Sequence, residues 1–403
     1  MSTGNRISSF FSNVWLPVAA VLAMLCMTTA TAMDRDSGPI KVGITVSLTG
    51  DYAIPGKDEL SGVQMWASDV NSRGALLGRK VEVIYYDDKS DAATSARLYE
   101  RLINEDKVDL LLGPYSSELT LAASTVAEKY DFPMVATGAA DGHIWSRGYK
   151  NIFGIDAPAR EYMKLLVDSA AAAGLKRIAL IYADSDFPKD VADGVRDLAA
   201  RNNMEIVFDK MYSEDTKDFT ALMQLMKTSR PDVVIGGTYL DDSIGIVRAA
   251  KKVRLSPRAF VFTVGPSLKE FGNALGPDAD GVLGVVSWIR SAHLPMARDF
   301  SYRYKQKHGH NPGAHVAYGY GGGQVLEAAV RLAGSLDRDA VRQQLSEMKF
   351  RSLLGHYDVD ATGRQVGKLI FVLQWQNGRR LLVLPEHLRE SPIQYPFKPW
   401  SER

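Results

Sequence analysis

The hydrophobic positions of this chain fall into short apolar runs that alternate with stretches of helical periodicity. Runs at 40–46, 81–86, 110–112 and 134–136 are separated by segments whose apolar residues recur every three or four positions. Apolar runs of this length are typical of strands buried on both faces of a parallel sheet, and the intervening period is typical of amphipathic helices. The pattern predicts a β-α-β series with right-handed crossovers and helices on both faces of the sheet.

A second series of the same kind begins after residue 155. Strands are predicted at 177–182, 205–211 and 232–236, with another near Phe260, and amphipathic segments lie between them. Two such series in one chain predict an α/β fold of two doubly wound parallel-sheet lobes, with a crevice between the lobes.

The last third of the chain has too few strands for a sheet of its own. Helical periodicity dominates 298–348, whereas the strands predicted at 369–375 and 381–384 are joined by a turn at 377–378 (Asn-Gly). The chain is therefore expected to return to the first lobe and then to the second. The predicted lobes are an N-terminal lobe of residues 38–155 plus 290–356 and a C-terminal lobe of residues 156–289 plus 357–400.

Three crossovers join lobes of this composition, near 154–158, 286–290 and 357–360. A hinge of three segments allows bending about one axis and resists twisting. This arrangement suits closure of the two lobes around a ligand.

The first 32 residues have the pattern of an export signal. Arg6 precedes an apolar stretch at 14–27, and residues 30–32 (Ala-Thr-Ala) match an A-x-A cleavage site. A membrane anchor is the less favoured alternative, because the stretch is short for a span of about 20 residues and contains Pro17. Residues 1–32 are therefore predicted to be a signal peptide, and the mature chain is expected in the periplasm.

The charge balance and the cysteine content exclude several kinds of chemistry. The sequence has 48 Lys and Arg against 47 Asp and Glu, a formal net charge of +1. Nucleic acid is therefore not an expected partner. Cys26 is the single cysteine and lies in the predicted signal, so the mature chain is expected to lack disulfides and thiol chemistry.

Motifs that carry catalysis are incomplete. Residues 363–369 resemble a phosphate-binding loop, but three residues instead of four separate the glycines, and Leu369 replaces the Ser or Thr that binds Mg²⁺. A G-x-S-x-G elbow does not occur, and His308, His310 and His315 have no accompanying Cys or H-E-x-x-H helix. No catalytic residue, metal or cofactor is expected, and a secreted α/β enzyme is the alternative from another class.

Two loops that follow neighbouring predicted strands are the best candidates for a site. Residues 113–117 follow one strand and residues 137–140 follow the next. The carboxyl ends of adjacent parallel strands meet at one edge of a sheet, where helix N-termini offer free N–H groups to anions. Ser116 or Ser117 is expected to cap the next helix or to donate its hydroxyl to an anion. Both alternatives are open on this pattern.

Several short motifs occur in order along essentially the whole mature chain. They are Ile40-Lys-Val-Gly-Ile, Ser47-Leu-Thr-Gly50, Asn71-Ser-Arg-Gly74, Val83-Ile-Tyr-Tyr-Asp-Asp88, Gly113-Pro-Tyr-Ser-Ser117, Arg147-Gly148-Tyr149, Arg177-Ile-Ala-Leu-Ile, Asp218-Phe219-Thr220, Gly236-Gly-Thr-Tyr239 and Gly281-Val-Leu-Gly284. Their order and spacing together resemble the periplasmic solute-binding proteins of the leucine/isoleucine/valine-binding type. The resemblance implies a type I periplasmic binding protein without enzymatic activity, usually a monomer, that delivers its ligand to the permease subunits of an ABC importer.

The same resemblance implies the residues that hold the ligand. A serine in the first loop and main-chain groups of the second are expected to hold the ligand carboxylate. Glu161 falls near a family acid that meets the ligand amine, Tyr239 matches a tyrosine of the second lobe, and Tyr52 and Pro55 lie in the loop that usually closes over the ligand side chain. The residues implied on the carboxylate side are Tyr115, Ser116, Ser117, Gly138, Ala139 and Ala140.

Two departures from the family pattern concern the ligand amine. Ala140 stands where the family usually has threonine, and residues 264–266 (Val-Gly-Pro) replace an acid expected after the strand at Phe260. The expected ligand is a small carboxylate, first an amino acid of the branched-chain or hydrophobic class. An aromatic or other amine-free carboxylate is the alternative, and a ligand sensor with the same fold is a further one.

Overall fold

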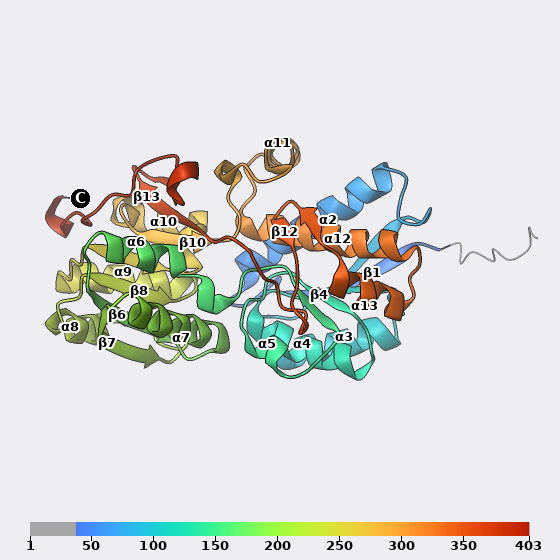
Figure 1. Ribbon diagram of the computed structural model, residues 1–403, viewed down its shortest axis with the longest axis horizontal. Helices are drawn as coiled ribbons and strands as arrows, with labels where there is room; N and C mark the ends of the chain where they lie inside the picture. Colours follow the sequence, from blue (N-terminus) through green and yellow to red (C-terminus); the bar gives the residue numbers. More distant parts are fainter. Residues whose placement is uncertain (1–37, 403) are drawn as a thin grey trace, which may run out of the picture. The chain divides into compact units, whose positions relative to one another are not determined.

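The structure is a computed structural model that describes residues 38–402 of the 403-residue chain. The predicted signal peptide, residues 1–32, lies outside the described residues. Within residues 38–402 the helices and strands are arranged around two sheets, one on each side of the view in Figure 1.

The first sheet is parallel throughout. Within the described residues it has five strands in the order β2-β1-β3-β4-β5, and each neighbouring pair is parallel. The apolar runs recognised in the sequence supply strands of this sheet, as predicted. Most of β1 and all of β3 and β4 are buried, whereas the edge strand β2 is largely not buried. The strands are β1 (Ile40–Val46), β2 (Val81–Asp87), β3 (Leu110–Leu112), β4 (Met134–Ala136) and β5 (Ile152–Gly154).

The second sheet is parallel except at one edge. Within residues 38–402 it has seven strands in the order β14-β13-β10-β9-β8-β6-β7. Strand β13 is antiparallel to both β10 and β14, because the chain re-enters this sheet from the first lobe and then turns back. The strands are β6 (Arg177–Ala183), β7 (Glu205–Tyr212), β8 (Val233–Gly237), β9 (Ala259–Phe262), β10 (Leu283–Val286), β13 (Phe371–Gln376) and β14 (Arg379–Leu384).

The hairpin predicted at residues 377–378 is confirmed. Asn377 and Gly378 join β13 to β14, and both have positive φ, at 52° and 70°. Asn-Gly is the dipeptide that adopts such a turn at low cost. The sequence analysis did not predict that this hairpin would pair with β10.

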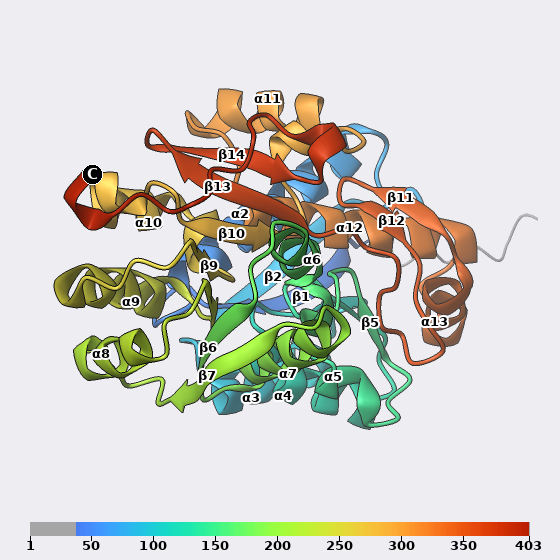
Figure 2. The ribbon, with the colours of Figure 1, turned by 60° about the vertical axis from the view of Figure 1, so that its left-hand side comes forward.

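The helices cover the faces of the two sheets (Figure 2). Two of the described helices begin at a capping aspartate. The Asp91 side chain accepts the N–H of Thr94 at 2.7 Å at the start of α3, and the Asp337 side chain accepts the N–H of Ala340 at 2.9 Å at the start of α13. Among residues 38–402, each helix is too short or too polar to cross a bilayer. The helices are α2 (Ala53–Ser72), α3 (Ala92–Asn104), α4 (Ser117–Lys129), α5 (His143–Ser146), α6 (Lys164–Ala172), α7 (Asp186–Arg201), α8 (Thr220–Thr228), α9 (Leu240–Val253), α10 (Lys269–Leu275), α11 (Ala297–His308), α12 (Ala314–Ala333) and α13 (Arg338–Glu347).

Helix α12 packs directly on α2, so the chain returns to the first sheet as predicted. Two glycines allow the close approach. A Cβ at Gly62 would overlap the carbonyl of Val316, and a Cβ at Gly319 would overlap the carbonyl of Glu59. A short antiparallel pair that the sequence analysis missed, β11 (Phe350–Ser352) and β12 (Gly355–Tyr357), follows α13.

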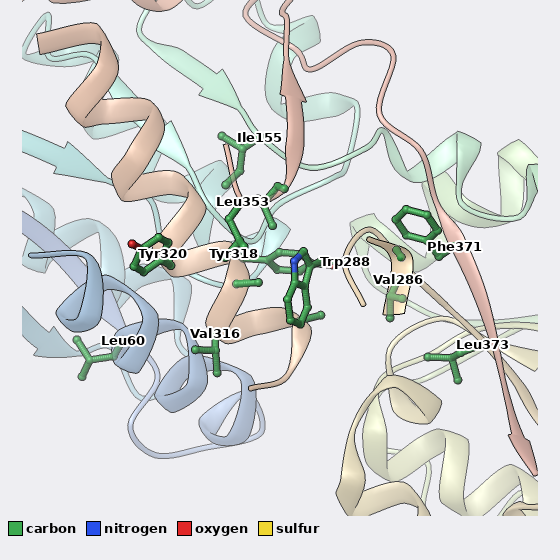
Figure 3. Packing of buried hydrophobic residues seen from close by; sticks show 14 of the residues in the cluster. Leu60, Ile155, Val286, Trp288, Val316, Tyr318, Tyr320, Leu353, Phe371 and Leu373 are labelled. Atoms are coloured by element: carbon green, nitrogen blue, oxygen red, sulfur yellow. The ribbon is translucent and has the colours of Figure 1, made fainter. Parts of the chain in front are cut away.

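The largest buried hydrophobic cluster extends from one sheet to the other (Figure 3). Leu60 and Val316 belong to the packed pair α2 and α12, whereas Val286 and Phe371 are paired on neighbouring strands of the second sheet. Trp288, which is 2% exposed, lies in the segment between these groups. The predicted fold class, α/β with two doubly wound sheets, is confirmed.

Candidate ligand-binding site

Two loops at the carboxyl edge of the first sheet lie side by side, as the sequence predicts. Strands β3 and β4 are neighbours, and beyond their ends Tyr115 and Gly138 form an isolated parallel bridge. The hydroxyl of Thr137 donates to the carbonyl of Gly113 at 2.6 Å. The two loops therefore form one surface.

Ser117 links these loops through its side chain. Its hydroxyl oxygen accepts the N–H of Ala140 at 3.0 Å and the N–H of Asp141 at 3.2 Å. An oxygen that accepts two hydrogen bonds keeps its own proton available to donate. Ser117 also begins α4, whose first-turn N–H groups have no acceptor within the helix and lie at the positive end of the helix dipole. This corner can hold an anion.

Ser116 lies immediately before that helix. It is 1% exposed, and its hydroxyl has no hydrogen-bond partner of normal geometry within residues 38–402. The phenol of Tyr52 interacts with it outside that geometry. Burial of an unsatisfied hydroxyl costs about 1 to 3 kcal/mol, and a bound ligand could supply the missing partner.

The loops line a cavity of about 40 Å³ between the two sheets. Most of the predicted carboxylate side is present, together with the predicted tyrosine of the second lobe. The predicted residues that line the cavity are Tyr115, Ser116, Ser117, Gly138, Ala140 and Tyr239.

Two predicted residues lie close to the cavity without lining it. Ala139 is buried between two lining residues. Tyr52 is 7% exposed, and its ring centroid lies 5.6 Å from that of Tyr115 and 5.3 Å from that of Tyr239. Tyr52 therefore covers the tyrosines of the cavity from outside.

The placement of Pro55 in a closing loop was wrong. Pro55 is buried in the first turn of α2, where a missing N–H and a fixed φ are tolerated. It does not line the cavity.

Glu161 lies away from the cavity. Glu161 ends a short 3-10 helix (Ala159–Glu161), and its side chain is exposed and outside the cavity. The turn directs Ala159 and Tyr162 inward and Glu161 outward, because consecutive positions of a 3-10 helix point about 120° apart.

One main-chain group predicted for the ligand is already occupied. The N–H of Ala140 is donated to Ser117, and the carbonyl of Ala140 accepts the N–H of Ala159 at 2.9 Å. The second bond places the segment after β5 against the loop of residues 138–140.

A chain of aromatic rings borders the cavity, and sequence reasoning missed most of it. The Tyr162 and Phe187 centroids are 5.4 Å apart, and those of Phe187 and Tyr239 are 6.1 Å apart. On the other side, the ring of His315 lies 5.0 Å from Tyr115 and 5.4 Å from Tyr318. Phe187 and Tyr318 come from helices, where their periodicity indicated only core positions. No local signal could have found them.

Asp156 is the acid that sequence reasoning missed. It follows β5 and lines the cavity at 5% exposure. Burial raises the pKa of its carboxyl, and hydrogen bonds from Ser287, Tyr162 and the N–H of Ala157 oppose that rise. A polar residue two positions after a buried strand, at a predicted crossover, was the available signal.

Burial also shifts the pKa of two groups near the loops, His315 and Glu59. Burial lowers the pKa of His315 to about 4. Burial also raises the pKa of Glu59 to about 8, and Glu59 Oε2 accepts the N–H of Tyr115 at 2.9 Å. This hydrogen bond fixes the position of the first loop. Residues 38–402 contain no group of three His, Cys, Asp or Glu side chains placed to hold a metal ion.

Two doubly wound sheets with a cavity between their carboxyl edges are the architecture of a type I periplasmic binding protein. Residues 39–380 match the family model described as periplasmic binding protein, and the chain belongs to that family. The resemblance stated from the sequence motifs is confirmed.

Curated relatives cover nearly the whole chain. Leu/Ile/Val-binding protein homolog 7 of Brucella melitensis is 27% identical over 381 residues, which is 89% of this chain and 95% of that protein. Homolog 8 of Brucella suis is 26% identical over 390 residues, covering 91% of this chain and 95% of that protein.

Solved structures share the fold. The leucine-binding protein LivK of Thermotoga maritima superposes with a TM-score of 0.79 at 22% identity, covering 87% of this chain and 100% of that chain. A solute-binding protein of R. palustris in complex with benzoate gives 0.77 at 19% identity, covering 89% and 98%. The isoleucine complex of LivJ from Streptococcus pneumoniae gives 0.78 at 22%, covering 89% and 100%.

Proposed function

We propose that this protein is the solute-binding subunit of an ABC importer and captures a small carboxylate, in the first place an amino acid of the branched-chain or hydrophobic class. The observation that carries the proposal is the unpartnered hydroxyl of Ser116 beside Ser117 at the start of α4, inside the cavity. Charge-assisted hydrogen bonds are worth about 1.5 to 3 kcal/mol each. Two or three of them would supply much of the roughly 8 kcal/mol of a micromolar binder.

Capture proceeds by closure of two lobes. The lobes are the N-terminal one of residues 38–155 plus 290–356 and the C-terminal one of residues 156–289 plus 357–400, and they bend about the three connecting segments. The contact between Tyr52 and Tyr239 at 5.3 Å closes the cavity in this arrangement. The closed form is then presented to the permease subunits, after export through a signal peptide at residues 1–32.

An amine-free aromatic carboxylate is the second candidate ligand. The rings of Tyr162, Phe187 and Tyr239 offer stacking surfaces for an aromatic ring. The R. palustris structure with the same fold holds benzoate. A ligand sensor for a membrane protein is compatible with the same cavity.

A thermal-shift screen of the purified mature chain tests the proposal. One panel contains α-amino acids and the other contains the corresponding amine-free acids with benzoates. Ligands raise the midpoint by mass action, so at least one panel is expected to stabilise the protein by several degrees. No stabilisation by either panel would refute the proposal. Loss of uptake of the identified ligand in a deletion strain then separates import from sensing.

A further inference from the structure

The carboxylate of Asp156 is held in one orientation at the wall of the cavity. Oδ1 accepts the N–H of Ala157 at 2.7 Å, and Oδ2 accepts the hydroxyl of Tyr162 at 2.8 Å. Each carboxylate oxygen can accept a further hydrogen bond. Asp156 therefore offers a preorganised acceptor to anything that occupies the cavity.

The cavity contains no cation to balance this acid. Among the described residues that line it, Asp156 is the sole Asp or Glu, and none is Lys or Arg. Lys368 acts on Asp156 through its charge, and Asp156 in turn opposes the burial that lowers the pKa of Lys368 to about 8. Lys368 does not line the cavity, and its amine donates to the carbonyl of His356 at 3.4 Å. A buried carboxylate without a paired cation is costly, and a ligand cation would remove that cost.

The aromatic rings that line the cavity together with Asp156 also favour a cationic ligand group. Tyr162, Phe187 and Tyr239 form a continuous aromatic wall, and the faces of such rings attract ammonium groups. The carboxylate corner is close by, because Ala159, three residues after Asp156, donates its N–H to Ala140. The acceptor, Asp156, and the corner at Ser116 and Ser117 that offers donors therefore lie on segments that contact each other.

We propose, on the basis of the function proposed above, that Asp156 determines ligand specificity by accepting the ammonium group of a zwitterionic ligand. The ligand carboxylate then lies at Ser116 and Ser117. The acid expected after the strand at Phe260 to meet the ligand amine is absent from residues 264–266. In this proposal Asp156, from a different part of the chain, binds the amine in its place. An amine-free anion would bring a second negative charge into this small cavity and would have to be bound with a proton.

Matched ligand pairs and variants test the assignment. We would measure the affinity of L-leucine and 4-methylpentanoate, and of L-phenylalanine and 3-phenylpropanoate, by calorimetry with the wild type, Asp156→Asn and Asp190→Asn. Asp190 is a suitable control because it is as buried, at 4%, and does not line the cavity. Removal of one charge-assisted bond is expected to weaken the amino acid about ten- to a hundredfold in Asp156→Asn. The amine-free acid should bind Asp156→Asn as well as, or better than, it binds the wild type.

The outcomes separate this inference from the proposed function. If Asp156→Asn changes both members of a pair by the same factor, or if the wild type prefers the amine-free acid, Asp156 does not accept an ammonium group. Those results would leave the carboxylate-binding function intact. If no member of either pair, nor any acid of the wider screen, binds the wild type, both proposals fail.

A second measurement uses the wild type alone and does not depend on the folding of a variant. Calorimetry in buffers of different ionisation enthalpy counts the protons taken up on binding. The groups that act on Asp156 are Tyr115, Tyr162, Tyr318, Ser287 and Lys368, and His315 lines the same cavity. At pH 7, more protons are expected to be taken up on binding of 4-methylpentanoate than on binding of L-leucine. Equal uptake for both ligands would overturn the inference.

Discussion

The hydroxyl oxygen of Ser117 accepts the N–H of Ala140 at 3.0 Å, and this bond joins the loops that follow β3 and β4. The same oxygen accepts the N–H of Asp141 at 3.2 Å. One side chain thus holds the second loop in place and presents a donor to the cavity. Substitutions at and near Ser117 can therefore distinguish effects on ligand affinity from effects on folding stability.

Ser117→Ala is expected to weaken ligand binding by about 1 to 3 kcal/mol, because it removes a hydrogen-bond donor to the ligand carboxylate. It should also lower the midpoint of unfolding without preventing folding, since two buried N–H groups lose their acceptor. Titration calorimetry and thermal unfolding measure the two effects. Ser124→Ala, in the same helix and outside the cavity, is the control for stability alone. Unchanged affinity in Ser117→Ala would remove Ser117 from the site.

Ser116→Ala is expected to have the opposite effect on stability. The Ser116 hydroxyl is buried without a partner of normal geometry, so its removal should leave the ligand-free midpoint unchanged or raise it. Ligand affinity should nevertheless fall, because the ligand supplies the missing partner. Thermal unfolding with and without saturating ligand measures both. A variant that is less stable without ligand and binds normally would contradict this role.

Tyr52→Ala is expected to accelerate ligand dissociation about two- to tenfold, because it removes an aromatic contact worth about 0.5 to 1.5 kcal/mol with Tyr239. Tyr52→Phe keeps the ring but loses the polar contacts of the hydroxyl with Glu118, Tyr239 and Ser116, so its rate should lie between those of the wild type and Tyr52→Ala. Stopped-flow displacement gives the rates. If Tyr52→Phe and Tyr52→Ala accelerate dissociation equally, the ring contact does not hold the closed form.

Glu59→Gln is expected to change how stability depends on pH. The pKa of Glu59 is about 8 in the folded protein, against 4.5 for the free side chain, because of burial. Between these values the unfolded chain loses its proton while the folded carboxyl keeps it, so the free energy of unfolding falls as pH rises. Below pH 4.5 both states are protonated, and this contribution vanishes.

The unfolding midpoint of the wild type should therefore decrease from pH 5 to pH 8 relative to that of Glu59→Gln, which cannot ionise. Calorimetric scans at unit pH intervals measure the difference. The exposed Glu82→Gln removes the same charge from β2 and is the control. Parallel curves for the wild type and Glu59→Gln would show that Glu59 ionises normally in the folded protein.

The fold could be predicted from the sequence because the patterns that indicate its strands, helices and turns are local. Short apolar runs such as β3 and β4 alternate with amphipathic helices, and a turn of Asn377 and Gly378 marks the final hairpin. The antiparallel pairing of β13 with β10 was not accessible, because it depends on where a distant strand re-enters the sheet.

By itself, the sequence determined the two strand-loop units with their serines, and the order of its motifs indicated the family. Only the tertiary structure decided the rest. It turned Glu161 outward, placed Pro55 in a helix, and brought Asp156 and the ring of Tyr318 to the cavity. The physical reason is that a loop at the end of a strand follows from local backbone chemistry, whereas the orientation of a side chain and its distant neighbours follow from the packing of whole elements.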